Sequence, residues 1–234
     1  MIKIIISFLC ALISFLVVWT FTPWLIKYLR KINLVVVDQN KENKPLVPIS
    51  GGIIVMGGIF IGLLIYVFFK VFFFELPLGK YYLTYVFAAI ISIMMITFVG
   101  FIDDLIIKRN HESSSGLKQW QKPLLTLVAA IPLIVINAGN DTMNMPFLGD
   151  IKFGLIYPMI LIPLGVVGAA NMVNLLAGFN GLETGMGLVY TGMLGLYAYT
   201  NGRLISSLIA LTTFSALLAF YYYNKYPAKI LPGD

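Results

Sequence analysis

Long apolar runs, separated by short polar segments, follow one another along almost the whole chain. Seven such runs can be marked, and they cover Ile4–Thr22, Ile53–Phe73, Tyr82–Phe101, Leu124–Asn137, Phe153–Ala170, Leu182–Tyr199 and Leu204–Tyr222. A membrane-spanning helix needs about 20 apolar residues, and a lipid-exposed backbone must satisfy its own hydrogen bonds. The pattern predicts an all-α bundle of about seven transmembrane helices, in a single integral membrane domain over residues 1–234.

Four segments of this pattern carry additional signals. The fourth run is the shortest, and the fifth contains Pro158 and Pro163, which predict a kink. Between them, Asn140–Asp150 contains Pro and Gly and is typical of a turn or hairpin. The first run could be a signal peptide, but no small-residue cleavage site follows it, so we expect a retained helix.

The composition agrees with a membrane protein. Hydrophobic residues make up 59% of the chain and charged residues 11%, whereas a soluble domain carries about 25% charged residues. The net charge of +6 could suggest nucleic acid, but the basic residues are divided among short loops, so no nucleic-acid partner is expected. Cys10 is the single cysteine, which excludes an internal disulfide and a cysteine-based metal site.

The distribution of basic residues predicts the orientation. Of the 16 Lys and Arg residues, 11 lie in loops after odd-numbered runs, and 5 lie at the N-terminal end or in the even loops and their margins. Cytoplasmic loops carry the excess of Lys and Arg. The odd loops are therefore expected to face the cytoplasm, with the N-terminus outside.

The same parity places four polar clusters on one side of the membrane. They are Asp38–Lys44, Asp103–Lys122, Asn171–Asn180 and Asn224–Asp234. Any cytoplasmic loop is polar, which is the simpler explanation. Several of these polar groups, however, lie at or inside the ends of the apolar runs, where burial is expensive, and this favours a functional site.

Asp103 and Asp104 follow a largely apolar run. Two adjacent carboxylates repel each other, and a membrane boundary penalises both charges. A divalent cation would relieve this conflict, and magnesium binds one or two carboxylates together with water and substrate phosphates. The alternative is a solvated acidic pair that ends a helix.

Amide side chains form a second candidate group. Asn171, Asn174 and Gly178 are spaced at i, i+3 and i+7, which would place them on one helical stripe, and Asn180 with Gly181 forms a turn signal. Asn amides can bind a base, a phosphate or a metal. They can equally hold neighbouring helices together.

Lys122 and Pro123 open the fourth run. Pro is favoured at the start of a helix, and a helix N-terminus with an added lysine suits a phosphate group. An ordinary positive-inside anchor is the alternative.

These clusters, in this order, resemble the polyprenyl-phosphate N-acetylhexosamine-1-phosphate transferase family, glycosyltransferase family 4. The segments that carry the resemblance are Asp38–Lys41 with Pro48–Gly52, Gly100–Asp104, Asn171–Glu183 and Pro227–Asp234. Within the third, Ala-Gly-Phe-Asn-Gly-Leu-Glu looks like the archaeal and eukaryotic branch, which uses UDP-N-acetylglucosamine and dolichyl phosphate.

The resemblance implies a transferase in which a polyprenyl phosphate attacks the sugar-linked phosphate of a UDP-sugar, and UMP leaves. It implies Mg²⁺ or Mn²⁺ as the cofactor and a lipid bilayer as the environment of the protein. A homodimer is one oligomeric state compatible with it. Loop parity places the active site on the cytoplasmic side, and the short loops favour an archaeal cell membrane over the endoplasmic reticulum.

The resemblance also assigns roles to individual residues. Asp103 and Asp104 would be the catalytic pair, and Asn174 and Asp234 would hold the metal. The residues expected to bind substrate are Lys41, Lys122, Asn171, Gly178, Asn180 and Leu231.

Three departures from the family pattern stand out. Leu231 replaces an aromatic residue near the base, and Ile49 replaces a polar residue. The family continues past Asp234, so the sequence is expected to be the N-terminal two-thirds of a longer fold. A transporter or channel, or a catalytically inactive truncated relative, are the competing hypotheses.

Overall fold

The computed structural model describes residues 2–73, 82–110, 116–145, 147–175 and 178–233. Helices dominate, with two short hairpins between them. The elements in chain order are α1 (Ile2–Lys31), β1 (Val35–Val37), β2 (Leu46–Pro48), α2 (Gly52–Phe72), α3 (Tyr82–Asn110), α4 (Gln121–Val128), α5 (Ile131–Ile136), β3 (Thr142–Met145), β4 (Gly149–Lys152), the π-helix η1 (Tyr157–Leu161), α6 (Ile162–Leu175), α7 (Leu182–Thr200) and α8 (Leu204–Asn224).

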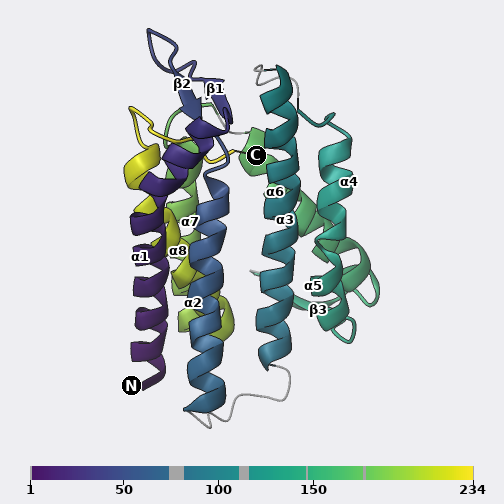
Figure 1. The fold of residues 1–234 in the computed structure, drawn as a ribbon. Helices are drawn as coiled ribbons and strands as arrows, with labels where there is room; N and C mark the ends of the chain where they lie inside the picture. Colours follow the sequence, from purple (N-terminus) through teal and green to yellow (C-terminus); the bar gives the residue numbers. More distant parts are fainter. Residues whose placement is uncertain (1, 74–81, 111–115, 146, 176–177, 234) are drawn as a thin grey trace.

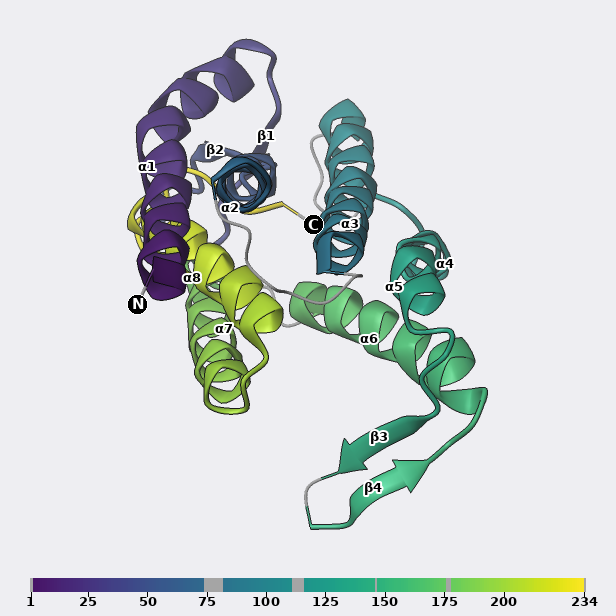
Figure 2. The same cartoon turned by 90° about the horizontal axis from the view of Figure 1, so that it is seen from below.

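The helices form two groups that stand side by side. Figure 2 shows α1, α2, α7 and α8 packed together, with α3, α4, α5 and α6 forming the second group. Helix α2 packs closely against α1 because two glycines face it. A Cβ on Gly58 would lie 2.5 Å from Val18 Cγ2, and a Cβ on Gly62 would lie 2.9 Å from the Cys10 carbonyl oxygen. Small residues four positions apart are typical of close contacts between membrane helices.

Five helices among the described residues are long and apolar enough to cross a membrane. They cover Ile5–Lys31, Gly52–Phe72, Tyr82–Ile107, Tyr157–Leu175 and Leu204–Asn224. Large apolar side chains, such as Phe68, Phe98 and Met193, remain exposed on the outer surfaces of the helices. The helical membrane architecture predicted from the sequence is therefore confirmed. The other two predicted spans correspond to α7 and to the pair α4 and α5.

Several boundaries differ from the predicted ones. Helix α1 continues through Pro23 to Lys31, and α3 continues past Phe101 to Asn110. The fourth run is not one helix, because α4 ends at Val128 and α5 begins at Ile131, with Pro132 in its first turn. Each of these two helices is too short to cross a membrane alone.

The prolines of the fifth run lie where the helix is irregular. Pro158 lies in the π-helical turn η1, and Pro163 lies in the first turn of α6. Proline cannot donate a backbone hydrogen bond, so it disturbs the regular α-helical pattern. The irregularity falls in the run where the sequence predicted a kink.

The two hairpins lie at opposite ends of the bundle (Figure 1). Strands β3 and β4 pair antiparallel, with Thr142 opposite Lys152, which confirms the hairpin predicted over Asn140–Asp150. Strands β1 and β2 also pair antiparallel, with Val36 opposite Val47. This second hairpin was not predicted, because strands of three residues show no clear alternation.

Candidate active site

The chain after α8, residues 225–233, folds back against the junction between β2 and α2 and is called the returning segment. The Leu231 N–H donates to the Pro48 carbonyl at 2.8 Å, and the N–H groups of Gly51 and Gly52 donate to the carbonyls of Leu231 at 3.0 Å and Pro232 at 2.7 Å. These three backbone hydrogen bonds join segments that are far apart in sequence. They bring the last described residues to the β1–β2 end of the bundle.

A buried asparagine holds the base of this segment. Asn224 is 0% exposed, and its Oδ1 accepts a hydrogen bond of 2.7 Å from Thr184 Oγ1. Its Nδ2 donates to the Ile230 carbonyl at 3.0 Å. Since both sides of the amide are used, Asn224 fixes the returning segment to the end of α8 and to the start of α7.

The two acidic residues of α3 lie beside this segment. Asp103 is 1% exposed and Asp104 is 3% exposed, so they do not form a solvated pair at the end of a helix. Lys122 Nζ lies 3.0 Å from Asp103 Oδ2, and the Leu117 N–H donates to Asp103 Oδ1. Ser50 Oγ donates to Asp104 Oδ2 at 2.5 Å. Buried carboxylates require such partners, because an uncompensated charge in a low-dielectric site is strongly unfavourable.

Two glycines let the backbone approach these carboxylates. A Cβ on Gly116 would lie 2.5 Å from Asp103 Oδ1. Gly233 has a φ of +83°, and a Cβ there would meet Asp104 Oδ2 and would lie 2.9 Å from the Ser50 nitrogen. The two acids are therefore covered by main chain at positions where a side chain does not fit.

A second polar cluster surrounds Asp38, which follows β1 and is 1% exposed. Its Oδ2 accepts from Asn180 Nδ2 at 3.0 Å and lies 3.0 Å from Lys41 Nζ, and its Oδ1 accepts from the Asn40 N–H at 3.0 Å. Burial acts to raise the pKa of Asp38. The hydrogen bonds from Asn180, Lys41 and Asn40 and the charge of Lys41 outweigh burial, so the pKa lies below its usual value.

Further contacts connect this cluster to the returning segment. Lys41 Nζ donates to the Ala228 carbonyl at 2.7 Å, and Asn40 Nδ2 donates to the Gly178 carbonyl at 3.1 Å. Residues 228–233 therefore pass from the Asp38 cluster to Asp104. The described parts of the four polar segments, which loop parity placed on one side of the membrane, meet at one end of the molecule.

Asn171 lies deeper, between α6 and α4. Its Nδ2 donates to Thr126 Oγ1 at 3.1 Å and to the Val167 carbonyl at 2.8 Å, so it joins the two helices. Thr126 in turn donates to the Lys122 carbonyl at 3.0 Å. Helix α6 ends and α4 begins at the polar end of the molecule, so Asn174, three residues after Asn171, lies nearer to that end.

The predicted stripe of Asn171, Asn174 and Gly178 is wrong in its last member. Helix α6 ends at Leu175, and Gly178 lies in the connection to α7, where a Cβ would have no neighbour within 4 Å. Gly181, with a φ of +82°, precedes α7 and confirms the turn predicted beside Asn180. Gly178 contributes its carbonyl to Asn40 and is not part of a helical face.

An open hollow of about 550 Å³ lies beside the Asp38 cluster. Its walls include Asn40, Asn180 and the aromatic residues Phe179 and Tyr226. Leu231 is partly buried and packs against the hydrophobic core. Aromatic surface beside Asn180 is therefore available from Phe179 and Tyr226, although Leu231 offers none.

The carboxylates and amides at this end suit a magnesium ion. Among the described residues, no group of three or more His, Cys, Asp or Glu side chains forms a metal site. Magnesium does not need one, because it commonly takes one or two carboxylates and completes its shell with water and substrate phosphates. Asp103, Asp104 and Asn174 provide oxygen donors of the right kind, whereas Asp234 lies outside the described residues.

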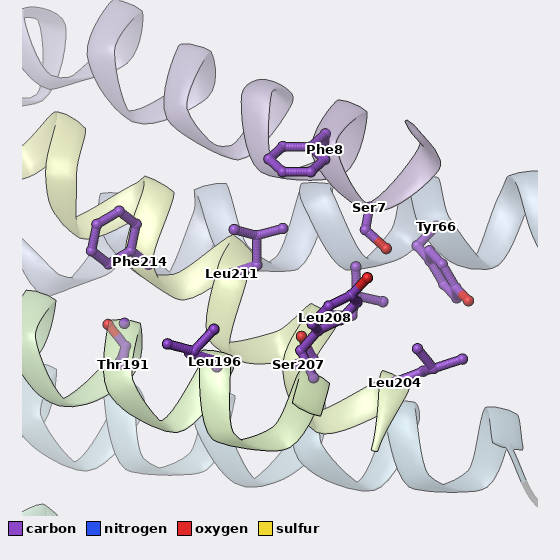
Figure 3. Close-up of a pocket in the computed structure, with 13 residues that line it drawn as sticks. Ser7, Phe8, Tyr66, Thr191, Leu196, Leu204, Ser207, Leu208, Leu211 and Phe214 are labelled. Carbon is purple, nitrogen blue, oxygen red and sulfur yellow. The ribbon is translucent and has the colours of Figure 1, made fainter. Parts of the chain in front are cut away.

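A different cavity, of about 510 Å³, lies between α1, α2, α7 and α8. Figure 3 shows Phe8, Leu196, Leu208 and Leu211 among the residues that line it. It lies near the start of α1, at the end of the bundle away from Asp103. None of the described residues that line it is acidic or basic, so it is separate from the candidate active site.

Sequence reasoning did not identify Ser50, Asn224 or Asp38 as individual site residues. Ser50 and Asp38 lie within segments that carried the family resemblance, but their contacts reach 54 and 142 positions along the chain. For Asn224, the available sequence signal was a polar residue at the end of an apolar run.

The fold and this site together define a membrane-embedded helical protein with a polar site at one end that suits phosphate chemistry. The family model of glycosyl transferase family 4 matches residues 86–234. The chain belongs to this family, and it is an integral membrane protein.

Three relatives illustrate the match. The chain is 35% identical to the putative UDP-N-acetylglucosamine–dolichyl-phosphate N-acetylglucosaminephosphotransferase of Saccharolobus solfataricus, over 99% of the chain and 67% of the relative. It is 30% identical to the protein of the same name from Sulfolobus acidocaldarius, over 97% of the chain and 65% of the relative. It is 36% identical to the phospho-N-acetylmuramoyl-pentapeptide-transferase of Clostridium perfringens, over 62% of the chain and 46% of the relative. The chain thus spans about two-thirds of the length of the first two relatives.

Proposed function

We propose that the protein transfers N-acetylglucosamine-1-phosphate from UDP-N-acetylglucosamine to a dolichyl or other polyprenyl phosphate, with release of UMP. The observation that carries the proposal is the buried pair Asp103 and Asp104, held beside Lys122 and reached by the segment that ends at Gly233. The names of the two relatives that match nearly the whole chain supply the sugar nucleotide and the lipid.

In the proposed reaction, an oxygen of the lipid phosphate forms a bond to the sugar-linked phosphorus. The bond between this phosphorus and the bridging oxygen breaks, and UMP leaves. Phosphoryl transfer asks the protein mainly for positioning and for neutralisation of charge. Asp103 would orient or deprotonate the lipid phosphate, with Asp104 as the second catalytic acid, and Lys122 would contact the diphosphate.

Asp103, Asp104, Asn174 and Asp234 are the proposed candidates to hold Mg²⁺ or Mn²⁺. The bound ion would supply positive charge to the diphosphate. Lys122 lies in the first turn of α4, where a helix N-terminus also favours anions. Since low dielectric strengthens each of these interactions, a site at the membrane boundary suits the chemistry.

The amide and lysine residues have separate proposed roles. Asn180 lines the hollow beside Phe179 and Tyr226, which suits uridine. Lys41 and Gly178 hold the walls of this hollow together through contacts with Ala228 and Asn40.

The polar end is proposed to face the cytoplasm, with the N-terminus outside and seven spans in this part of the chain. The excess of basic residues in the loops at this end supports this orientation. A single membrane domain and an archaeal cell membrane, in preference to the endoplasmic reticulum, belong to the same proposal. The source organisms of the first two relatives support that location.

Product analysis tests the proposal. The protein expressed from its complete gene would be incubated in detergent with UDP-N-acetylglucosamine, dolichyl phosphate and magnesium. Mass spectrometry should then find a dolichyl diphosphate that carries one N-acetylglucosamine, together with an equal amount of UMP. A lipid that carries the sugar on one phosphate only, with UDP as the second product, would contradict the proposal.

A further inference from the structure

A buried carboxylate fixes the direction in which an amide of the proposed uridine site points. Asp38 Oδ2 accepts a hydrogen bond of 3.0 Å from Asn180 Nδ2, across 142 positions of sequence. Asn180 Oδ1 is buried and has no hydrogen-bond partner among the described residues. A buried amide oxygen without a partner is uncommon in proteins and calls for a ligand or an ordered water.

Chemistry excludes the opposite orientation of this amide. An ionised carboxylate can only accept hydrogen bonds, so the NH₂ group of Asn180 must face Asp38. If the amide were reversed, its oxygen would meet the carboxylate oxygen, and two acceptors would repel each other. Lys41 Nζ, 3.0 Å from the same carboxylate oxygen, favours the ionised form of Asp38.

Lys41 is itself held in place. Its ammonium group also donates to the Ala228 carbonyl at 2.7 Å, so the returning segment, Asp38 and Asn180 form one connected network. Because Asp38 is 1% exposed, water does not compete readily for its oxygens. The network therefore holds the NH₂ group of Asn180 toward Asp38 and leaves its oxygen as the side of the amide that has no protein partner among the described residues.

We infer that Asp38 is a positioning residue that selects the nucleobase, because it makes Asn180 an obligatory hydrogen-bond acceptor. This inference rests on the proposed function, and it concerns the base of the sugar nucleotide. Uracil carries an N–H between its two carbonyl groups, and this N–H can donate to Asn180 Oδ1. The corresponding ring nitrogen of cytosine carries no hydrogen and is an acceptor, so it would meet the amide oxygen as one acceptor facing another.

The expected selectivity follows from the hydrogen bond that cytosine cannot make. A buried polar group left without its partner weakens binding by about 10- to 100-fold. UDP should therefore bind about 10- to 100-fold more tightly than CDP, which differs from UDP in the base alone.

Equilibrium binding of UDP and CDP tests this inference, with the protein expressed from its complete gene in detergent micelles and magnesium. The variant Asp38→Asn keeps the size of the side chain but can donate a hydrogen bond, which lets the Asn180 amide turn round. The preference for UDP should then fall to about 3-fold or less, within the range of one weakened hydrogen bond. In turnover with UDP-N-acetylglucosamine, the KM should rise while kcat stays near the wild-type value, because base binding is the same in the ground and transition states.

The control Glu42→Gln removes an exposed carboxylate from the same loop and should keep the wild-type preference. Asn180→Ala should lose the preference as Asp38→Asn does, and the double variant should lose no more, because Asp38 acts through Asn180. If Asp38→Asn keeps the wild-type ratio of UDP affinity to CDP affinity, the inference is overturned. If Asp38→Asn does not fold, the same ratio in Asn180→Ala overturns it. Equal binding of UDP and CDP by the wild type also overturns it but leaves the proposed function intact, whereas wild-type protein that binds neither nucleotide contradicts both.

Discussion

The hydroxyl of Ser50 offers a sharp test of how Asp104 is held. Ser50 is 2% exposed, and its Oγ donates to Asp104 Oδ2 at 2.5 Å. The change Ser50→Ala removes this hydrogen bond and leaves the backbone as it is. A hydrogen bond to a charged group contributes about 1.5–3 kcal/mol, and we expect kcat/KM to fall about 10- to 100-fold if the bond fixes Asp104 for catalysis.

The backbone at the same residue provides a second, independent effect. Ser50 has a φ of +71°, in the left-handed region that costs a residue with a Cβ about 1–2 kcal/mol. Ser50→Gly also loses the hydroxyl but removes this cost, while glycine adds about 0.4–1 kcal/mol of chain entropy to the unfolded state. Ser50→Gly should therefore lose as much activity as Ser50→Ala, and its unfolding temperature should equal or exceed that of Ser50→Ala.

UMP release and thermal unfolding followed by tryptophan fluorescence would measure the two effects. Ser92→Ala is the matched control, since Ser92 is also buried but its Oγ has no hydrogen-bond partner among the described residues. This control should keep full activity and stability. Turnover by Ser50→Ala at the wild-type rate would contradict a role for Ser50 in positioning Asp104.

Three other predictions concern the returning segment, the orientation and the charge of Asp38. Gly233→Ala should lower the rate of UMP release at least 10-fold, because a Cβ would meet Asp104 and the left-handed φ costs about 1–2 kcal/mol. The control Gly168→Ala has open space around the new Cβ and should be neutral in the same assay. Cysteines placed at Asn43 and Leu148, both exposed in hairpin connections, should react with a membrane-impermeant maleimide from opposite sides of intact vesicles, and labelling from one side would contradict the orientation. The pKa of Asp38 is lowered, so its stabilising charge is complete above the unfolded pKa of about 3.9 and is lost only as pH falls through the lower folded value. The preference for UDP over CDP should therefore stay constant from about pH 8 to about pH 5. A decline of this preference within that range would contradict the role of the Asp38 charge.

The helical architecture could be predicted because the apolar runs are long. The end of α3 could not, because Asp103 and Asp104 interrupt the run and made its helix appear to stop at Phe101. The structure continues the helix to Asn110 and gives both acids buried partners. A boundary drawn from hydropathy fails where a buried charge has a specific partner that the local sequence does not reveal.

The convergence of the polar segments could be predicted from loop parity, whereas their contacts could not. Parity places Asp38 and Asn180 on the same side of the membrane, but their hydrogen bond depends on the packing of α1, α7 and the returning segment. In the same way, helical spacing placed Gly178 on a face with Asn171, because the spacing does not reveal that α6 ends at Leu175. Contacts of this kind follow from tertiary packing, which local patterns do not encode.

UMP release tests the catalytic role of Asp103 and Asp104 most directly. Three forms of the protein expressed from its complete gene would be assayed with UDP-N-acetylglucosamine and dolichyl phosphate. Turnover by the wild type should stop when EDTA removes magnesium and return when magnesium is added. Asp103→Asn and Asp104→Asn should each lose at least about 100-fold of kcat, as expected for groups that stabilise the transition state. Turnover at the wild-type rate in both variants would contradict the claim that this buried pair is the catalytic centre.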